Sequence, residues 1–181
     1  MKTQSRLMAV ALVLVAHTAL AQGERKDLQV ANDISNTVNR YPYFTIFDDI
    51  SANVNNGVVT LTGKVTLPFK STELEKRVAK VAGVTSVVNR IAALPVSQFD
   101  DDLRYRLARS IYGNANFWNY SIMANPPIHI VVEHGRVTLT GVVQSEVDRM
   151  LARSLATQFG VMSLKNELKT NAEMREALEK S

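Results

Sequence analysis

One seven-residue pattern occurs twice in the chain and constrains its fold more than any other feature. The sequence GVVTLTG begins at Gly57, and GRVTLTG begins at Gly135, 78 residues later. In each copy valine and leucine alternate with threonine, which places apolar side chains on one face of a β-strand and threonines on the other. The residue before each glycine, Asn56 or His134, favours a two-residue hairpin turn with positive φ. Each copy therefore predicts the second strand of a β-hairpin with one buried face.

A second pair of matching segments indicates the size of the repeated unit. The segment GVTSVVNRI, which starts at Gly83, is echoed by GVMSLKNEL, which starts at Gly160, an offset of 77. A repeat of this length is too long for a solenoid and is typical of a small domain. The chain is therefore predicted to contain two domains of the same fold.

The hydrophobic periodicity around these segments predicts the same order of elements in both units: helix, strand, strand, helix, strand. The predicted helices cover residues 27–39, 71–82, 102–112 and 145–159, and the predicted strands cover residues 46–54, 58–66, 86–94, 128–133, 136–143 and 162–169. The third strand of each unit follows a helix, which favours parallel pairing with the second strand. We therefore predict an α+β fold of two αββαβ domains, each with two helices packed on one face of a three-stranded mixed sheet.

The predicted boundaries divide the chain into five parts. Residues 27–95 form the first domain and residues 102–170 the second, with a linker at 96–101 between them. Residues 171–181 are charged and are predicted to be a frayed tail. Residues 1–21 combine a basic start, an apolar run and an Ala-Leu-Ala end, which is typical of a cleavable secretory signal peptide. We therefore expect a periplasmic or secreted protein, with an uncleaved membrane anchor as the alternative.

Composition excludes several kinds of chemistry. The chain contains no cysteine, which excludes disulfides, thiolate metal ligands, cysteine nucleophiles and a lipid attached to cysteine. Its net charge is +4, and loss of residues 1–21 lowers this to +2, because 19 basic and 17 acidic side chains remain. So small a charge does not indicate a nucleic-acid-binding protein, and any anion binding must come from a local patch.

Ionisable side chains are too scattered to predict an active site. His129 and Glu133 share a strand face but lie about 13 Å apart at the rise of a strand, too far to bind one metal ion. The aspartates at 100–102 are interpreted as stabilising a helix N-terminus. No phosphate-binding, dinucleotide-binding or nucleophile-elbow motif occurs. We predict no enzyme activity, no metal and no cofactor; a hydrolase that uses His129 or the acidic clusters is the weakest alternative.

The repeated pattern resembles the BON domain (bacterial OsmY and nodulation), and the tandem arrangement behind a signal peptide is similar to OsmY-type proteins. The resemblance implies an αββαβ fold, an envelope location and a non-catalytic role in attachment to phospholipid membranes or in envelope integrity under stress. The family's glycine positions fall on Gly57, Gly63, Gly83, Gly135, Gly141 and Gly160. We interpret these glycines as structural: the first of each unit in the hairpin turn, the second at a bulge or a close helix approach, and the third as a helix cap.

The first helix of the second unit provides the predicted binding surface. Its apolar stripe is Leu103, Leu107 and Ile111. The predicted lipid-binding residues lie on its other side and in the loop that follows: Tyr105, Arg106, Arg109, Tyr112 and Trp118. Arginine and aromatic side chains together suit a phospholipid headgroup layer. The alternative is a solvated helix face beside a loop whose aromatic residues cover the core or the contact between domains.

A protein partner is the main alternative to a lipid. In this interpretation the chain is a chaperone-like envelope module, and an exposed sheet edge or the aromatic loop binds another protein or a second copy of the chain. Both interpretations predict a non-enzymatic binding protein of the cell envelope.

Overall fold

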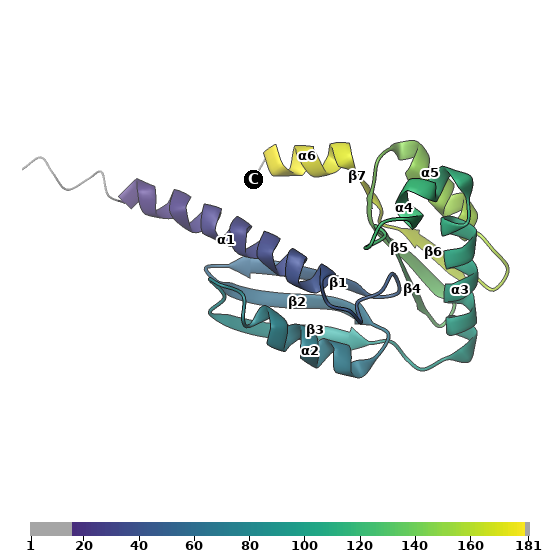
Figure 1. Cartoon of the computed structure of the whole chain (residues 1–181), viewed down its shortest axis with the longest axis horizontal. Coiled ribbons are helices and arrows are strands. Elements are labelled where there is room, and N and C mark those ends of the chain that lie inside the picture. Colours follow the sequence, from purple (N-terminus) through teal and green to yellow (C-terminus); the bar gives the residue numbers. More distant parts are fainter. Residues whose placement is uncertain (1–15, 180–181) are drawn as a thin grey trace, which may run out of the picture.

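The two copies of the repeated strand lie at the centre of two separate sheets in the computed structural model, which describes residues 16–179 (Figure 1). In the first sheet, β1 (Asp49–Asn55) and β3 (Ser86–Ala93) flank β2 (Val58–Val65). β1 pairs with β2 antiparallel and β3 pairs with it parallel. The predicted mixed sheet is therefore confirmed in the first repeat.

The second sheet repeats this topology. β4 (Ile128–Glu133) is antiparallel to β5 (Arg136–Val143), and β6 (Ser163–Asn166) is parallel to it. A short β7 (Lys169–Thr170) continues the parallel pairing along β5. The third strand of the second repeat is thus interrupted at residues 167–168, whereas that of the first repeat is continuous.

Two helices cover one face of each sheet (Figure 1). These helices are α1 (Ala16–Asn39) and α2 (Pro68–Val78) in the first repeat, and α3 (Gln98–Tyr112) and α5 (Glu146–Ala156) in the second. The predicted αββαβ order is therefore confirmed in both repeats. Three shorter helices add to it: η1 (Ala115–Phe117), α4 (Trp118–Ser121) and α6 (Asn171–Glu179). Most of the predicted signal peptide, residues 1–15, lies outside the described residues, and residues 16–21 form the first turns of α1.

Each repeat has its own apolar core between helices and sheet. In the first, Ile34 of α1 and Leu74 of α2 pack with the alternating residues Val59, Leu61 and Val65 of β2, all at most 1% exposed. The second core has the same construction and gains Phe117 from η1. Full burial of such a side chain contributes about 1.5–3 kcal/mol, so these alternating positions supply much of the stability of each repeat.

A carboxylate from the first helix of each repeat binds the turn of its own hairpin. Asn56 and Gly57 have φ values of 50° and 76°, which fit the predicted two-residue turn. Asp27 accepts hydrogen bonds from their backbone nitrogens at 2.7 and 3.1 Å. In the second repeat Asp100, which is fully buried, makes the same two bonds to residues 134–135 at 2.7 and 2.8 Å. This aspartate therefore anchors a hairpin, a role that we did not predict.

The start of α3 corrects the predicted linker at 96–101. Ser97 is the N-cap of α3, and its hydroxyl accepts a hydrogen bond from the backbone nitrogen of Asp100 at 3.2 Å. Serine is as good an N-cap as aspartate, so the helix begins at Gln98, four residues earlier than predicted.

The C-terminal segment corrects the predicted frayed tail, because residues 171–179 form α6. The Thr170 hydroxyl accepts a hydrogen bond from the Glu173 backbone nitrogen at 3.2 Å, and the Glu173 carboxylate accepts one from the Thr170 backbone nitrogen at 2.7 Å. This is a capping box. Arg149 of α5 also donates to Glu173 at 2.9 Å. Both contacts lower the pKa of the Glu173 carboxyl, the backbone hydrogen bond most strongly.

The segment before β1 joins the two repeats. The backbone nitrogen of Ile130 in β4 donates to the carbonyl oxygen of Ile46 at 2.7 Å. Phe47 packs against the core of the second repeat, although it belongs to the first. Lys64 of β2 forms an ion pair with Glu133 of β4, and this bond lowers the pKa of the Glu133 carboxyl. The two repeats therefore meet along the outer edge of β4.

Candidate functional site

α3 turns an apolar stripe to the core and a cationic, aromatic face to solvent. The three predicted inward residues are fully buried: Leu103, Leu107 and Ile111. Arg104 is also buried, and it donates to the carbonyl oxygen of Val132 at 2.6 Å and pairs with Asp101. The predicted outward residues Arg106 and Arg109 are exposed.

A groove of about 430 Å³ lies along the exposed side of α3. Its lining residues are Phe99, Asp102, Tyr105, Arg106 and Arg109. Within residues 16–179, neither Arg106 nor Arg109 forms an ion pair with a carboxylate. The groove therefore has two guanidinium groups against one carboxylate, and it favours an anion. Tyr105 is 65% exposed, and its ring also contacts the ring of Phe47 edge-on at 5.4 Å.

Three large apolar side chains are exposed at or near this groove. Phe99 lines it and is 50% exposed. Phe159 is 92% exposed, and Met162, which lies against the hairpin turn that Asp100 of α3 binds, is 79% exposed. Arg106 donates to the carbonyl oxygen of Phe159 at 3.2 Å, and both Arg106 and Phe99 lie against Gly160. The loop after α5 is thereby fixed beside α3. We call the six exposed residues the α3 face: Phe99, Tyr105, Arg106, Arg109, Phe159 and Met162.

The first repeat provides an internal comparison for the α3 face. Lys26 lies against Gly83 in the first repeat, where Phe99 lies in the second. Thr85 lies against the turn glycine of its hairpin, where Met162 lies in the second. Equivalent places in the same fold thus carry a polar side chain in one repeat and a large apolar one in the other.

Two further pairs follow from the matched segments. Arg106 lies as far after Asp100 as Asp33 lies after Asp27, so these two residues are equivalent. Phe159 directly precedes Gly160 and Ala82 directly precedes Gly83, so these two are equivalent as well. Because the first repeat folds with Asp33 and Ala82, the fold does not require arginine or phenylalanine at these places. Sequence reasoning did not find the exposed apolar residues of the α3 face, but residue-by-residue alignment of the two repeats would have marked them.

Tyr112 does not belong to this face, and the predicted outward orientation is wrong. Its hydroxyl donates to the carbonyl oxygen of Ile128 at 2.6 Å and accepts from the backbone nitrogen of the same residue at 2.9 Å. Burial raises the pKa of the Tyr112 hydroxyl, and the backbone hydrogen bond with Ile128 lowers it by a smaller amount. Tyr112 therefore ties the end of α3 to the first residue of β4.

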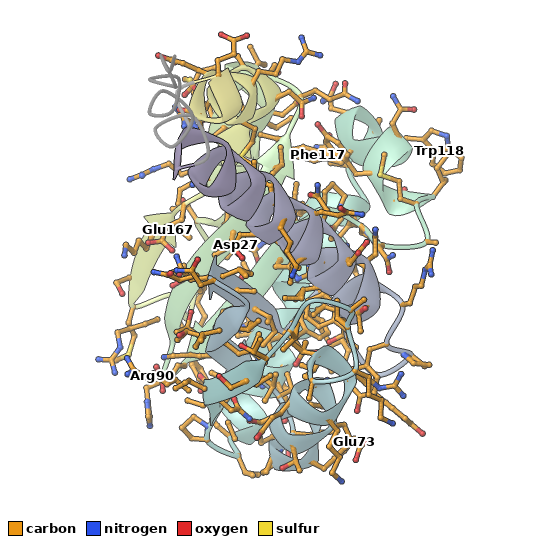
Figure 2. All side chains as sticks on the ribbon, turned by 90° about the vertical axis from the view of Figure 1, so that its left-hand side faces the viewer. Asp27, Glu73, Arg90, Phe117, Trp118 and Glu167 are labelled. Atoms are coloured by element: carbon orange, nitrogen blue, oxygen red, sulfur yellow. The ribbon has the colours of Figure 1, made fainter. Side chains whose placement is uncertain are left out.

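The loop aromatics divide between core and solvent. Phe117 is fully buried and Tyr120 is 4% exposed, and their rings lie 5.6 Å apart. The Tyr120 hydroxyl donates to Asp148 at 2.9 Å, which joins α4 to α5. Trp118 is 64% exposed and projects from α4 into solvent, while Phe117 beside it points inward (Figure 2). Within the described chain, no hydrogen bond, ion pair or ring contact joins the Trp118 side chain to the α3 face.

All six predicted glycines have positive φ, between 70° and 122°. A side chain at Gly141 would meet the carbonyl oxygen of Pro127 at 1.8 Å, because Pro127 immediately precedes Ile128, the residue opposite Gly141 in β4. The close approach is therefore to the backbone at the start of a strand and not to a helix. The predicted caps at Gly83 and Gly160 are corrected, because α2 ends at Val78 and α5 ends at Ala156.

The groups considered for hydrolytic chemistry form structural bonds. Asp48 is fully buried, and its carboxylate accepts from the backbone nitrogen and hydroxyl of both Thr45 and Thr66 and from Lys70 at 2.7 Å. His129 contacts the backbone carbonyl of the same aspartate through Nδ1 at 2.6 Å. In the part of the chain that the structure describes, no three His, Asp or Glu side chains gather closely enough to bind a metal ion.

Two αββαβ units with the same turn-binding aspartates define a protein built from tandem copies of one small α+β domain. The family model of the BON domain matches residues 26–95 and 118–172. The chain therefore belongs to the BON domain family, whose members are non-enzymatic binding domains. The predicted resemblance is confirmed.

Comparison with solved structures finds only distant similarity. Two structures from CdsD, a structural protein of the type III secretion system of Chlamydia trachomatis, are similar to the chain. One has 15% identity and a TM-score of 0.27, and covers 84% of this chain and 99% of its own. The other, the C-terminal domain, has 16% identity and a TM-score of 0.29, and covers 79% and 98%. Likeness at this level carries no argument about fold or function. No curated protein matches the chain.

None of the helices within residues 16–179 combines the length and the apolar character that a membrane-spanning segment needs.

Proposed function

We propose that this protein is an exported, non-enzymatic binding protein that attaches to anionic phospholipid surfaces through the α3 face of its second repeat. The observation that carries the proposal is the difference between the repeats. At equivalent places the first repeat has Lys26, Asp33, Ala82 and Thr85, and the second has Phe99, Arg106, Phe159 and Met162. The fold does not require the second set, and its exposed apolar members lower solubility, which is typical of an interaction surface.

The chemistry of the α3 face suits a headgroup layer. Guanidinium groups form paired hydrogen bonds with phosphate oxygens, and each arginine near an anionic membrane surface contributes about 1 kcal/mol. Phe159 and Met162 are exposed enough to enter the boundary between headgroups and acyl chains, where aromatic and apolar side chains are stable. Trp118, exposed on the neighbouring α4, is a further candidate contact. Membership of the BON family and the predicted signal peptide support an envelope location.

The proposal is tested by co-sedimentation with vesicles of phosphatidylglycerol and phosphatidylcholine. The double variant Arg106→Glu, Arg109→Glu is expected to bind about 30-fold more weakly or worse, because it loses about 2 kcal/mol of attraction and gains repulsion. The control Lys76→Glu, Lys80→Glu makes the same charge change on exposed residues of the first repeat and is expected to have a smaller effect. Equal losses in both variants would show that net charge, and not the α3 face, determines binding.

The same assay distinguishes the alternative of a protein partner. A protein-binding module would be indifferent to the phosphatidylglycerol content of the vesicles and to salt. Attachment through phosphate contacts instead weakens steeply as salt rises, because the charges are exposed and screened.

A further inference from the structure

A cleft of about 460 Å³ lies between the two repeats and is separate from the α3 face. α1 forms one wall, with Ile34 and Val38, and the second repeat forms the other with residues 125–127 and the outer face of β4 and β5. Clefts of this volume between domains are typical sites for small molecules. The sequence and the proposed function leave this cleft unexplained.

Two polar side chains of the second repeat meet at this cleft. His129 of β4 lies directly opposite Thr140 of β5 in the ladder, so both side chains share the sheet face that is turned to the first repeat. The hydroxyl oxygen of Thr140 is buried and has no hydrogen-bond partner within residues 16–179. A buried hydroxyl without a hydrogen-bond partner destabilises the folded state, so a polar group of a ligand that supplied this hydrogen bond would be favoured here.

The orientation of the His129 ring is fixed from the first repeat. Its Nδ1 lies 2.6 Å from the carbonyl oxygen of Asp48, and its ring packs against Phe44 with centroids 5.3 Å apart. A carbonyl oxygen only accepts, so the proton of the neutral ring is on Nδ1. Nε2 is therefore a hydrogen-bond acceptor.

The lining of the cleft limits the class of ligand. No lysine or arginine is among the described residues that line it. Among the described lining residues, Asp49 is the single Asp, Glu, Lys or Arg. Its neighbour Ile50 packs on the core of the first repeat. Because side chains alternate along a strand, the Asp49 side chain lies on the opposite face of β1. The remaining walls are mostly apolar. An anionic headgroup is disfavoured, whereas an apolar chain with one uncharged polar group fits.

We propose that the cleft between the repeats binds a neutral amphiphile, an aliphatic chain with a hydroxyl group, and that this hydroxyl bonds to Thr140 beside His129. The site takes one wall from each repeat, so binding also stabilises the contact between them. This inference does not depend on the proposed attachment to membranes.

The test is a titration of the ¹⁵N-labelled full chain with 1-octanol, monitored by NMR. We expect saturable shifts at the amides of Ile34, His129 and Thr140. Sodium octanoate is the matched probe, with the same chain length and a negative charge, and we expect it to bind at least several-fold more weakly because the cleft offers no cation. The isosteric variant Thr140→Val removes the hydroxyl and is expected to weaken octanol binding about 3- to 10-fold.

A second variant keeps the test independent of the hydroxyl. Ala31→Trp places a large side chain on the wall formed by α1 and is expected to abolish the saturable shifts while far-ultraviolet circular dichroism stays unchanged. Each of the following results would overturn the proposal: shifts that never saturate, equal octanol affinity in Thr140→Val, or equal binding of octanoate. If octanol produces no shift at these amides, the unpaired hydroxyl binds water only, and the proposal is wrong.

Discussion

Replacement of Asp100 by alanine tests the role of the turn-binding carboxylates. Asp100 is fully buried and accepts two backbone hydrogen bonds, one of them from the buried nitrogen of Gly135. A hydrogen bond to a charged group contributes about 1.5–3 kcal/mol, so loss of both is expected to cost about 3–6 kcal/mol of unfolding free energy. Asp27 makes the same pair of bonds in a more exposed place, where water replaces the lost acceptor. Asp27→Ala is therefore expected to cost only about 1–2 kcal/mol.

The assay is urea-induced unfolding of each variant, followed by far-ultraviolet circular dichroism. Asp102→Ala is the matched control, because this carboxylate is exposed in the same turn of α3, and we expect a change within about 0.5 kcal/mol. An Asp27→Ala variant that loses as much stability as Asp100→Ala would refute the argument that burial makes the second bond pair more important. A loss of only about 1 kcal/mol in Asp100→Ala would show that the turn forms without its carboxylate.

Three other predictions concern single residues. Gly141→Ala is expected to lose more than about 3 kcal/mol of unfolding free energy, since its φ of 114° and the Pro127 carbonyl both oppose a side chain; a near-normal urea midpoint would contradict this. Tyr112→Phe is expected to lose about 1–3 kcal/mol of unfolding free energy in the same measurement and to bind vesicles normally. Weaker vesicle binding by a variant that stays folded would show that Tyr112 belongs to the binding surface. The pKa of Glu133 lies below its ordinary value of 4.5, so its bond to Lys64 stabilises the folded state above that pH and is lost as the pH falls through the lowered pKa. Glu133→Gln is expected to remove this part of the acid dependence of unfolding, and an unchanged pH profile would show that the ion pair contributes nothing.

Much of the fold could be predicted because the duplicated strand has a strong, simple pattern. The alternation of Val59, Leu61 and Val65 gave the buried face of β2, and the matched glycines gave the size of the unit. Such patterns are read from neighbouring residues and do not require knowledge of contacts between distant parts of the chain. The helix, strand, strand, helix, strand order was therefore accessible without a structure.

Element ends were less predictable because several residues compete to define them. Three aspartates at 100–102 favour a helix start, yet Ser97 caps α3 and Asp100 binds a turn some 34 residues away, which no local pattern reveals. α5 ends at Ala156, before Gly160, because Thr157 has an extended backbone with φ −82° and ψ 90°, and its hydroxyl donates to the carbonyl oxygen of Arg153. The capping box of α6 was visible in the sequence from Thr170 to Glu173 and was overlooked.

The candidate site was predicted only in part. Helical spacing correctly placed Arg106 and Arg109 outside, but Tyr112 lies at the border of the apolar stripe, where a hydrogen bond to β4 decides its orientation. Phe159 escaped prediction because an exposed phenylalanine in a loop has no periodicity. Only its counterpart in the first repeat, Ala82, shows that the fold does not need it.

One variant tests directly whether the second repeat has a membrane-binding face that the first lacks. It replaces four residues of the α3 face by their counterparts: Phe99→Lys, Arg106→Asp, Phe159→Ala and Met162→Thr. The net charge changes by only −1, so general electrostatic attraction stays nearly constant. In co-sedimentation with phosphatidylglycerol vesicles we predict at least a tenfold loss of binding with unchanged circular dichroism, since the losses together exceed about 1.4 kcal/mol. Binding equal to that of the unchanged protein would show that these four residues do not form a membrane-binding face.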